Sequence, residues 1–434
     1  MKLSKYNVWA QCRGREFVYN SRTGSLLKVP LGTEQLLSAA TAIAESDAPE
    51  VLVQGGVILP DSTDELALLR NRYEFGRTAK SHLALTVISS LGCNFDCPYC
   101  YEDKRPEIVK PDVERAILKF VDERIAKGLK SIVVQWLGGE PLLGKKNILR
   151  MSHEFRARSE RHGIDYRSYI TTNGSLLTRR VANELVDAGV RRAQITLDGP
   201  PEVHDCMRPT RNGAGTFWKI LGNMKAVADI IPVVVRINVD KENFVHIDEL
   251  LDILEHEGLK DKIEVYVGHL ISVNDGAAQP SATYTRSCFN TRGFATTERY
   301  FNDSATARGF RSRVLDGPIL TPCMAMREEE YVIGSMGELY KCWKSVGNNN
   351  EVVGNIAEYE NLNSRVHRWL TYDPFEDAEC VSCSALPVCM GGCAHHTFDR
   401  RLFEDRCTTF RYESRHRVVQ FIEQVESAKS SAGR

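Results

Sequence analysis

The sequence lacks both a long apolar run and an excess of charge of either sign. No stretch reaches the roughly 18 apolar residues of a membrane-spanning helix, so we expect no membrane partner. Lysine and arginine number 56 against 57 aspartates and glutamates, a formal net charge of -1, which predicts no nucleic-acid partner. The opening MKLSKYNVWAQC also lacks the apolar core of a secretory signal peptide. Together these absences predict a cytoplasmic protein.

Cysteine, in contrast, is abundant, with 13 in 434 residues. A secreted disulfide framework is one interpretation, but that pattern belongs to short chains. In a long cytosolic chain, clustered cysteines more often bind metal. Ten of the 13 fall into two groups, which favours metal, and Cys12, Cys206 and Cys288 remain outside them.

The chain is longer than one hydrophobic core usually fills, so we expect two or three domains. Residues 1–80 read as a small sheet-plus-helix module. KYNVWAQC and REFVYN alternate like strands around a turn at Arg13-Gly14, and a helical stretch follows near 33–44. The acidic DSTDE opens a further helix, with Ser62 or Thr63 as its expected N-cap.

Residues 81–272 repeat a strand-then-helix pattern. Six strands are predicted, with the sequences LALTVIS, IVVQWLG, YRSYITTN, AQITLDG, VVVRINV and IEVYVGHL. Near-continuous apolar strands between amphipathic helices predict an α/β fold, a parallel sheet covered by helices. Six units are too few for a closed eight-unit barrel. We therefore expect a partial, TIM-like (β/α)6 barrel, with a doubly wound sheet as the alternative.

Two further regions complete the expected organisation. Residues 273–322 are polar and read as a bridge with one helix near 288–301. Residues 323–434 are dense in cysteine, have little regular periodicity, and end in a helix near 412–426.

The first cysteine group, LGCNFDCPYCYE, directly follows the first strand of the repeat. Loops at the carboxyl ends of such strands carry active sites in α/β proteins. The thiolates of Cys93, Cys97 and Cys100 can hold three irons of a [4Fe–4S] cube, which leaves the fourth iron open to a ligand. Zinc is the alternative, but it needs a fourth ligand, and the nearest histidine, His82, stands on the wrong side of the strand.

This triad, with the aromatic Tyr99 before its last cysteine, resembles the radical S-adenosylmethionine (SAM) superfamily. The resemblance implies that the open iron chelates the amino and carboxylate groups of SAM. One electron then cleaves SAM to methionine and a 5′-deoxyadenosyl radical, which abstracts a hydrogen atom from the substrate.

Later strands end in motifs that match SAM-binding elements of the same family. WLGGEPLL carries the GGE element, TTNG ends the third strand, and TLDGPPEVHDCMR resembles the SLDGP…HDxxR stretch of one branch. The SAM-binding residues implied are Tyr99, Gly138, Gly139, Glu140, Asn173, Thr196, Arg208 and Leu270.

Each of these residues has an expected contact and a plainer alternative. The glycines let the backbone approach a ligand, and the Glu140 carboxylate can hold an ammonium group; alone, GGE is also a tight turn. By resemblance, Thr196 and Arg208 contact SAM hydroxyl and carboxylate groups, and Leu270 packs on adenine. The alternatives are a surface ion pair for Arg208 and an ordinary core position for Leu270.

The second group holds seven cysteines and resembles the SPASM domain, which carries two auxiliary [4Fe–4S] clusters. It comprises Cys323, Cys342, Cys380, Cys383, Cys389, Cys393 and Cys407. The resemblance implies a distal cluster on Cys380, Cys383, Cys389 and Cys407. It implies a proximal cluster on Cys323, Cys342 and Cys393, whose fourth ligand is Cys288 or an open iron. A pair of structural zinc sites is the alternative.

Two enzyme classes share this set of motifs. Sulfatase-maturing enzymes have a catalytic aspartate directly after the cysteine that matches Cys342, and here that position is Trp343. Maturases of ribosomally made peptides often lack this aspartate. They also carry an N-terminal winged-helix-like element that binds the leader peptide as an added strand, which residues 1–80 loosely resemble. A structural cap is the alternative for that segment.

The sequence therefore predicts a radical SAM peptide maturase that installs a carbon–carbon or thioether cross-link. Its cofactors are SAM and three [4Fe–4S] clusters. Its partners are a precursor peptide with a leader and a reductant such as flavodoxin or ferredoxin. The alternatives are an anaerobic sulfatase-maturing, formylglycine-forming enzyme and a non-catalytic Fe–S electron-transfer protein.

Overall fold

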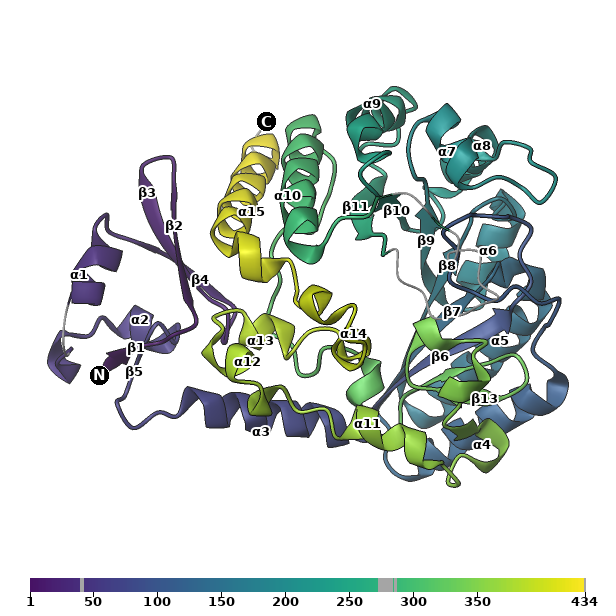
Figure 1. The fold of residues 1–434 in the computed structure, drawn as a ribbon, viewed down its shortest axis with the longest axis horizontal. Helices are drawn as coiled ribbons and strands as arrows, with labels where there is room; N and C mark the ends of the chain where they lie inside the picture. Colours follow the sequence, from purple (N-terminus) through teal and green to yellow (C-terminus); the bar gives the residue numbers. More distant parts are fainter. Residues whose placement is uncertain (40–42, 272–283, 285–286, 433–434) are drawn as a thin grey trace.

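A computed structural model describes residues 1–39, 43–271, 284 and 287–432, with side chains to 427. Its centre is a nine-stranded sheet in the order β11-β10-β9-β8-β7-β6-β12-β13-β14 (Figure 1). All six strands expected in the βα repeat form. They are β6 (His82–Ser90), β7 (Ser131–Gly138), β8 (Asp165–Thr172), β9 (Val190–Thr196), β10 (Val233–Val239) and β11 (Ile263–His269). Each is parallel to its neighbour, so the expected mostly parallel α/β sheet is confirmed.

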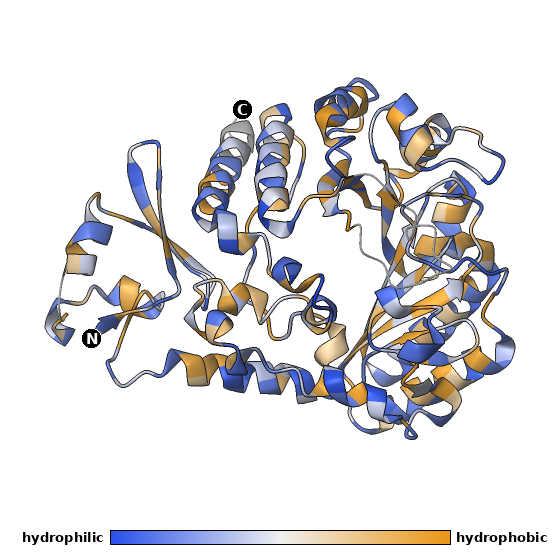
Figure 2. Ribbon diagram, viewed as in Figure 1, coloured by the Kyte–Doolittle hydropathy of each residue, from blue (hydrophilic) through white to orange (hydrophobic). Residues whose placement is uncertain are grey.

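Helices connect the successive strands and cover one face of this sheet. They are α4 (Pro111–Ala126), α5 (Lys145–His162), α6 (Arg179–Asp187), the short α7 (Pro201–Met207), α8 (Phe217–Val227) and α9 (Ile247–His256). In α4, Val113, Ile117, Phe120 and Val121 are buried on one helical face. They join a single apolar core with the outward side chains of the strands. Figure 2 shows apolar residues concentrated along these strands and helix faces.

The opposite face of the sheet is polar and lines a cavity, whereas the alternative of a doubly wound sheet would place helices on both faces. Burial alternates along β7, β8 and β11, as in a sheet with one covered face. The inward side chains include Thr86, Gln135, Thr171, Gln194, Arg236 and Asn238. Short polar positions within apolar strands therefore mark a functional face rather than interruptions of the core.

The cysteine-rich segment continues the same sheet. Strand β12 (Tyr331–Ile333) pairs in parallel with β6, and β13 (Glu338–Tyr340) and β14 (Gly354–Asn355) follow in antiparallel order. Four short helices come after them: α11 (His367–Leu370), α12 (Ala378–Ser382), α13 (Leu386–Cys389) and α14 (Ala394–Phe398). The sheet thus crosses from the βα repeat into the region after residue 322.

Two long helices lie side by side near the C-terminus (Figure 1). The bridge helix, expected near 288–301, is α10 (Thr291–Arg308), and the Asn290 side chain caps it by accepting from the Gly293 N–H. The last helix, expected near 412–426, is α15 (Phe410–Ala432), with non-helical backbone at Glu413. Residues 272–283 and 285–286 of the predicted bridge lie outside the described residues. No helix in the described ranges has the length and hydropathy to cross a membrane.

The N-terminal region forms an antiparallel sheet of β2 (Asn7–Cys12), β3 (Arg15–Asn20) and β4 (Ser25–Val29). The expected turn at Arg13-Gly14 is present, with both residues at positive φ. A second pair, β1 (Lys2–Leu3) with β5 (Ile58–Leu59), and helices α1 (Thr33–Ala39), α2 (Glu50–Gln54) and α3 (Glu65–Thr78) complete it. Residues 40–42 of the helix expected over 33–44 lie outside the described part of the chain.

The N-cap expected for α3 was wrong by one or two positions. The cap is Asp64, whose carboxylate accepts from the Leu66 and Ala67 N–H groups, both at 3.0 Å. Ser62 and Thr63 precede it in the turn. A carboxylate at this position also interacts favourably with the helix dipole, which favours Asp64 over the two hydroxyl residues.

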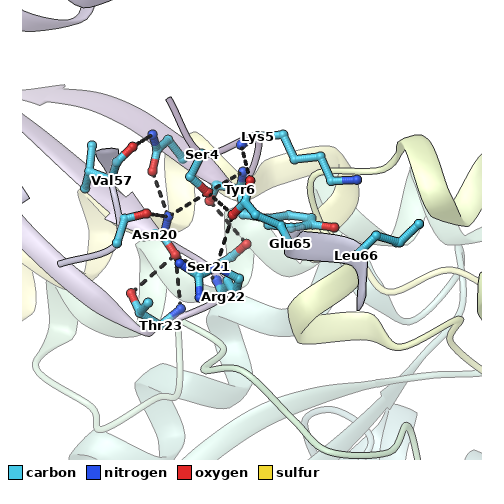
Figure 3. A network of polar contacts seen from close by, with 12 residues as sticks. Ser4, Lys5, Tyr6, Asn20, Ser21, Arg22, Thr23, Val57, Glu65 and Leu66 are labelled. Carbon is cyan, nitrogen blue, oxygen red and sulfur yellow. Dashed lines mark hydrogen bonds and ion pairs between the residues drawn. The ribbon is translucent and has the colours of Figure 1, made fainter. Parts of the chain in front are cut away.

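A buried polar network ties this region together (Figure 3). The Glu65 carboxylate at the start of α3 accepts from Ser4 Oγ at 2.6 Å, Lys5 N at 3.1 Å and Arg22 Nε at 3.0 Å. Asn20 Nδ2 donates to Ser4 Oγ, and to Gly56 O at 2.9 Å. Because these groups are buried and mutually satisfied, the network fixes the sheet against α3.

The N-terminal sheet packs on the cysteine-rich segment, with α3 running beneath both (Figure 1). Its apolar side chains share one cluster with α13 and α15, in which Tyr19 meets Phe410 edge to face. A second cluster joins Tyr73 of α3 to Phe375. The region is thus anchored beside the second cysteine group.

Candidate functional site

A cavity of about 920 Å³ lies between the polar face of the sheet and the cysteine-rich segment. Its walls come from the loop after β6, the inward positions of β6 to β11, the start of α10, and the region from Pro322 to Thr409. Both predicted cysteine groups contribute to it. Active sites form at the carboxyl edge of such sheets, and this cavity opens at that edge.

Cys93, Cys97 and Cys100 all line the cavity from the loop after β6. Cys93 and Cys97 are buried and Cys100 is half-buried. Burial raises the pKa of Cys93 to about 11 and that of Cys100 to about 12. These thiols are therefore neutral by themselves, and binding of a metal cluster would displace their protons.

The three thiols of the triad share one loop at the cavity wall, as the ligands of one [4Fe–4S] cluster would. Among the described residues, no three His, Cys, Asp or Glu side chains converge as ligands of one metal ion do. A [4Fe–4S] cube places each thiolate on a different iron, so its cysteines surround a cluster rather than one atom.

Gly138 and Gly139 pack backbone against backbone on the triad loop. A Cβ at Gly138, whose φ is 138°, would lie 2.1 Å from Ser90 O, and one at Gly139 would lie 2.6 Å from Gly92 O. Gly139 N donates to Ser90 O at 3.1 Å. Only glycines fit here, so the GGE motif has a structural requirement that a turn alone would not impose.

Glu140 does not have the role that we expected from the motif. It is fully buried and does not line the cavity. Its carboxylate accepts from Leu142 N at 3.0 Å, Thr172 Oγ1 at 2.7 Å and Asn173 N at 2.7 Å. These bonds join the loop after β7 to the loop after β8. The expectation that Glu140 holds the ammonium group of SAM is therefore corrected. Its carboxylate instead positions the two loops against each other.

Tyr99, Arg208, Asp198 and Asn238 form a buried polar network at the cavity wall. Arg208 Nη1 donates to the Tyr99 hydroxyl oxygen, and that hydroxyl donates to Asp198 Oδ2. Arg208 Nη1 also lies 3.6 Å from Asp198 Oδ2, and Asn238 Nδ2 donates to Tyr99 Oη at 3.3 Å. Arg208 is only 9% exposed, so the alternative of a surface ion pair was wrong.

The other predicted SAM-binding residues also line the cavity. Asn173 donates through Nδ2 to Asn94 Oδ1 at 2.8 Å, which links it to the triad loop. Thr196 is buried at the end of β9, and Leu270 is buried just after β11. The structure thus brings together every predicted SAM-binding residue at one edge, with Glu140 behind the wall.

The second cysteine group divides into two sets by electrostatic proximity. Cys342 interacts with Cys323 and Cys393. Cys389 interacts with Cys383 and Cys407, and Cys380 with Cys389 and Cys407. The SPASM resemblance implied the same two sets as cluster ligands, and that assignment stays a prediction.

Cationic side chains accompany both sets. Arg411 Nη1 donates to Cys407 Sγ at 3.1 Å, and Lys344 lies close to Cys342 and Cys393. Such cations offset the negative charge that bound thiolates carry. Cys288, the expected candidate for a fourth proximal ligand, is half-buried and does not line the cavity. His395 and His396 do line it.

Sequence reasoning missed several residues of the cavity wall. They are Gln135, Gln194, Arg236, Tyr101 and Lys344. The signal for the first three was present, because a polar residue at every second position of an apolar strand indicates a one-sided sheet. Tyr101 and Trp343 meet edge to face, with ring centroids 5.5 Å apart, and no local pattern predicts that contact.

Residues 87–254 match the family model of the Radical SAM superfamily. The chain therefore carries a radical SAM domain. It is similar to the GTP 3′,8-cyclase of Rhizobium meliloti (strain 1021), with 36% identity over 126 residues, 29% of this chain and 34% of that protein. The first curated relatives are thus matched over about a third of their own length.

A longer match joins the chain to the cysteine-type anaerobic sulfatase-maturating enzyme of Clostridium novyi (strain NT). It has 24% identity over 336 residues, 72% of this chain and 88% of that protein. Two solved structures share the fold. One is anSMEcpe with bound AdoMet and Cp18Cys peptide, at TM-score 0.59 and 17% identity, covering 80% of this chain and 99% of that one. The other is Streptococcus suis SuiB bound to precursor peptide SuiA, at TM-score 0.52 and 14% identity, covering 94% and 99%.

The residues present fit SAM beside a [4Fe–4S] cluster. Three thiols face the cavity from one loop, and Gly138 and Gly139, which also line it, pack backbone against backbone on that loop. Arg208 Nε is buried and has no hydrogen-bond partner within the described structure. An orphaned guanidinium N–H beside the triad is suited to an anion such as the carboxylate of SAM.

Proposed function

We propose that this chain is a radical SAM enzyme that modifies a ribosomally made precursor peptide by installing a carbon–carbon or thioether cross-link. One observation carries the proposal: a single cavity is lined both by the triad and by the proximal cysteines Cys323, Cys342 and Cys393. Two clusters bound there would face a substrate from opposite walls. When bound, SAM and the triad cluster would supply a radical that removes a hydrogen atom from carbon.

The chain's own residues have distinct tasks in this proposal. Cys93, Cys97 and Cys100 hold the SAM-binding cluster, and the seven later cysteines hold the two auxiliary clusters, three [4Fe–4S] clusters in all. Gly138 and Gly139 keep the triad loop in place and present their backbone to SAM at the cavity wall, and Tyr99, Asn173, Thr196 and Leu270 line its position. Arg208 binds its carboxylate. Burial raises the pKa of Tyr99, so its hydroxyl stays protonated and holds Asp198 and Arg208 in register.

The six parallel strands support the partial (β/α)6 barrel within residues 81–272, and the two cysteine sets support a SPASM domain within 323–434. Similarity to peptide-bound structures supports a peptide substrate. A reductant such as flavodoxin or ferredoxin would deliver electrons. A cytoplasmic location agrees with free, reduced cysteines.

Residues 1–80 are proposed to bind the leader of that peptide. In the described structure, β4 has β3 as its only ladder partner, so its outer edge is open. Leu31 and Leu36, which follow this edge, are 64% and 73% exposed. An extended leader could add a strand to β4 and cover these leucines.

A second candidate is the anaerobic maturation of sulfatases, because the longest curated match is to such an enzyme. The residue at position 343, a tryptophan, argues against sulfatase maturation. Trp343 follows Cys342 and packs against Tyr101, where the sulfatase-maturing resemblance requires an aspartate base.

Mass spectrometry of a candidate precursor peptide, encoded beside this gene and co-expressed with it, separates the two functions. Cross-linking predicts that the peptide loses two hydrogens and keeps its sulfur. A sulfatase-derived peptide in which cysteine becomes an aldehyde would instead support the second candidate. The matched control is co-expression with Cys93→Ala, which should leave both peptides unmodified.

A further inference from the structure

Most cations of the cavity wall are neutralised by partners of their own. Lys104 pairs with Asp96, and Arg406 pairs with Asp377 and Glu379. Arg208 pairs with Asp198, and Lys341 donates to the carbonyl oxygens of Arg327 and Glu330. Glu102 and Asp405 are the acidic residues of the described wall, and Asp405 Oδ1 accepts from Thr291 N.

Arg236 and Lys344 are the exceptions. Neither has a carboxylate within ion-pair distance in the described parts of the chain. Arg236 interacts electrostatically with Asp198, but the Asp198 carboxylate already accepts from Tyr99 and pairs with Arg208. Both residues line the cavity, Arg236 from β10 and Lys344 from the segment after Cys342. Lys344 also faces Cys342 and Cys393, whereas Arg236 faces no cysteine set.

The Arg236 guanidinium is held in place for a ligand. Its Nε donates to Asn238 Oδ1 at 2.7 Å, and it lies over the Tyr266 ring at 5.8 Å. It occupies space over β11 that exists because residue 268 is glycine: a Cβ there would lie 2.5 Å from Arg236 Nε and 2.7 Å from Nη2. With Nε engaged and the side chain fixed, the terminal nitrogens remain for a planar acceptor.

The Arg236 guanidinium lies between the wall that carries the triad and the wall that carries the proximal cysteines. Asn238 connects it to the Tyr99 hydroxyl on the SAM side, and Lys344 adjoins the proximal cysteines on the other. The edge-to-face pair Tyr101–Trp343 lines the same cavity. A group bound by Arg236 would therefore lie where the substrate must lie.

We propose that Arg236, with Lys344 opposite it, binds a carboxylate of the substrate peptide and so selects peptides that carry an acidic group at the reacting segment. This inference rests on the proposed peptide-modifying function. The carboxylate belongs either to an aspartate or glutamate side chain or to a free C-terminus, since both present the same bidentate acceptor.

The test is a selection from a random-peptide library displayed on mRNA, with the reconstituted full-length holoprotein and SAM. The wild type should enrich peptides with an acidic residue or a free C-terminal carboxylate. Arg236→Gln should bind the selected peptides about 10- to 100-fold more weakly, the loss expected for a charge-assisted hydrogen bond. Arg236→Lys keeps the positive charge but loses the two parallel N–H donors of the guanidinium, so it should recover part of the affinity.

The controls separate the possible sources of an effect. Arg115→Gln removes an exposed arginine of α4 that does not line the cavity, and should bind the peptides as the wild type does. Selected peptides are resynthesised with Asn or Gln for the acidic residue, or with an amidated C-terminus, to identify the carboxylate. Lys344→Gln tests the same anchor from the opposite wall if Arg236→Gln unfolds, as judged by thermal melting.

Enrichment without acidic preference, or equal binding by wild type and Arg236→Gln, would overturn the inference. A fall in SAM affinity of Arg236→Gln as large as the fall in peptide affinity would also overturn it, because it would assign the arginine to SAM. Adding reductant to the selected peptides tests the proposed function separately. Acidic peptides that bind through Arg236 but keep their mass would refute peptide modification and leave the anchor standing.

Discussion

At the scale of single residues, Gly139 shows how closely the loops of the site meet. Its Cα faces two carbonyl oxygens of the triad loop, and an added Cβ would lie 2.6 Å from Gly92 O and 2.8 Å from Leu91 O. Backbone atoms cannot yield as a flexible side chain can. The spacing between the triad and the next strand therefore depends on the absence of one methyl group.

Gly139→Ala should lower the free energy of unfolding by about 1–3 kcal/mol, the usual cost of overpacking, and should reduce SAM-dependent formation of 5′-deoxyadenosine. Gly222→Ala is the matched control, because Gly222 is exposed on the outer side of α8 and a Cβ there meets nothing within 4 Å. That control should gain about 0.4–1 kcal/mol. Equal stability of the two variants, measured by chemical denaturation, would contradict the close approach.

A second residue, His204, predicts that the stability of the folded protein falls in acid. Its Nδ1 accepts from Asp198 N at 3.2 Å and its Nε2 lies 3.1 Å from Thr216 Oγ1, so the buried ring is held neutral. Burial lowers the pKa of His204 well below its ordinary value. The unfolded chain therefore takes up the proton first, and this contribution to stability is complete above about pH 6.5 and is lost as the pH falls below it.

The wild type should lose stability as the pH falls from 6.5 to 5, and His204→Gln should lose less. The two slopes should differ by at most about 1.4 kcal/mol per pH unit, because one additional proton binds on unfolding. Thermal melting of both proteins across this range measures it. Parallel profiles would show that His204 does not carry the effect.

The identity of most site residues could be predicted from the sequence, but the direction in which each side chain points could not. The cysteines, Gly138, Gly139 and Arg208 follow from motifs whose spacing is local. The Glu140 carboxylate points away from the cavity because Thr172 and Asn173, which lie more than 30 positions later, supply its donors. Arg236 was missed because, apart from Asn238 on the same strand, the residues around its guanidinium are Tyr266 and Gly268 of the neighbouring strand β11.

At the scale of elements, the strands and helices were predictable where periodicity was strong. The six parallel strands and the apolar face of α4 are confirmed. One-sided coverage separates the expected partial barrel from the doubly wound alternative, and the sequence left both open because apolar content alone does not distinguish a sheet covered twice from one whose second face lines a cavity. Short helices such as α12 to α14 carry little periodicity, since the cysteines rather than an apolar stripe organise them.

The cap of α3 gives a test at this scale. Asp64→Ala should destabilise the protein by about 0.5–2 kcal/mol, because two helix N–H groups lose their acceptor. Ser62→Ala and Thr63→Ala, the caps expected from sequence, should change stability by less than about 0.5 kcal/mol. A ranking in which Thr63→Ala is the most damaging would restore the first expectation. Thermal melting of the three variants decides the matter.

At the scale of the whole molecule, one cavity joins the βα repeat to the cysteine-rich segment. The triad loop and the sheet form one wall, and the cysteine-rich segment forms the other. The N-terminal sheet packs behind the second cysteine group through α13 and α15. Under the proposed function, this arrangement would place leader binding by residues 1–80 beside the cysteine-rich wall of the cavity.

The three clusters proposed for this chain predict that iron is lost in portions, one cluster at a time. The reconstituted wild type should contain about twelve irons per chain, and Cys380→Ala and Cys93→Ala should each lose about four, because each removes a ligand from a different cluster. Iron and sulfide analysis of the purified proteins measures this. A similar loss from Cys12→Ala, a buried cysteine of the N-terminal sheet, would contradict the assignment.

The most direct test of the central claim is the formation of 5′-deoxyadenosine from SAM under anaerobic reduction. The account predicts that the iron-loaded wild type releases it, and that Cys93→Ala, Cys97→Ala and Cys100→Ala do not. A fully iron-loaded wild type that cleaves no SAM, or cleavage that persists without the triad, would contradict it.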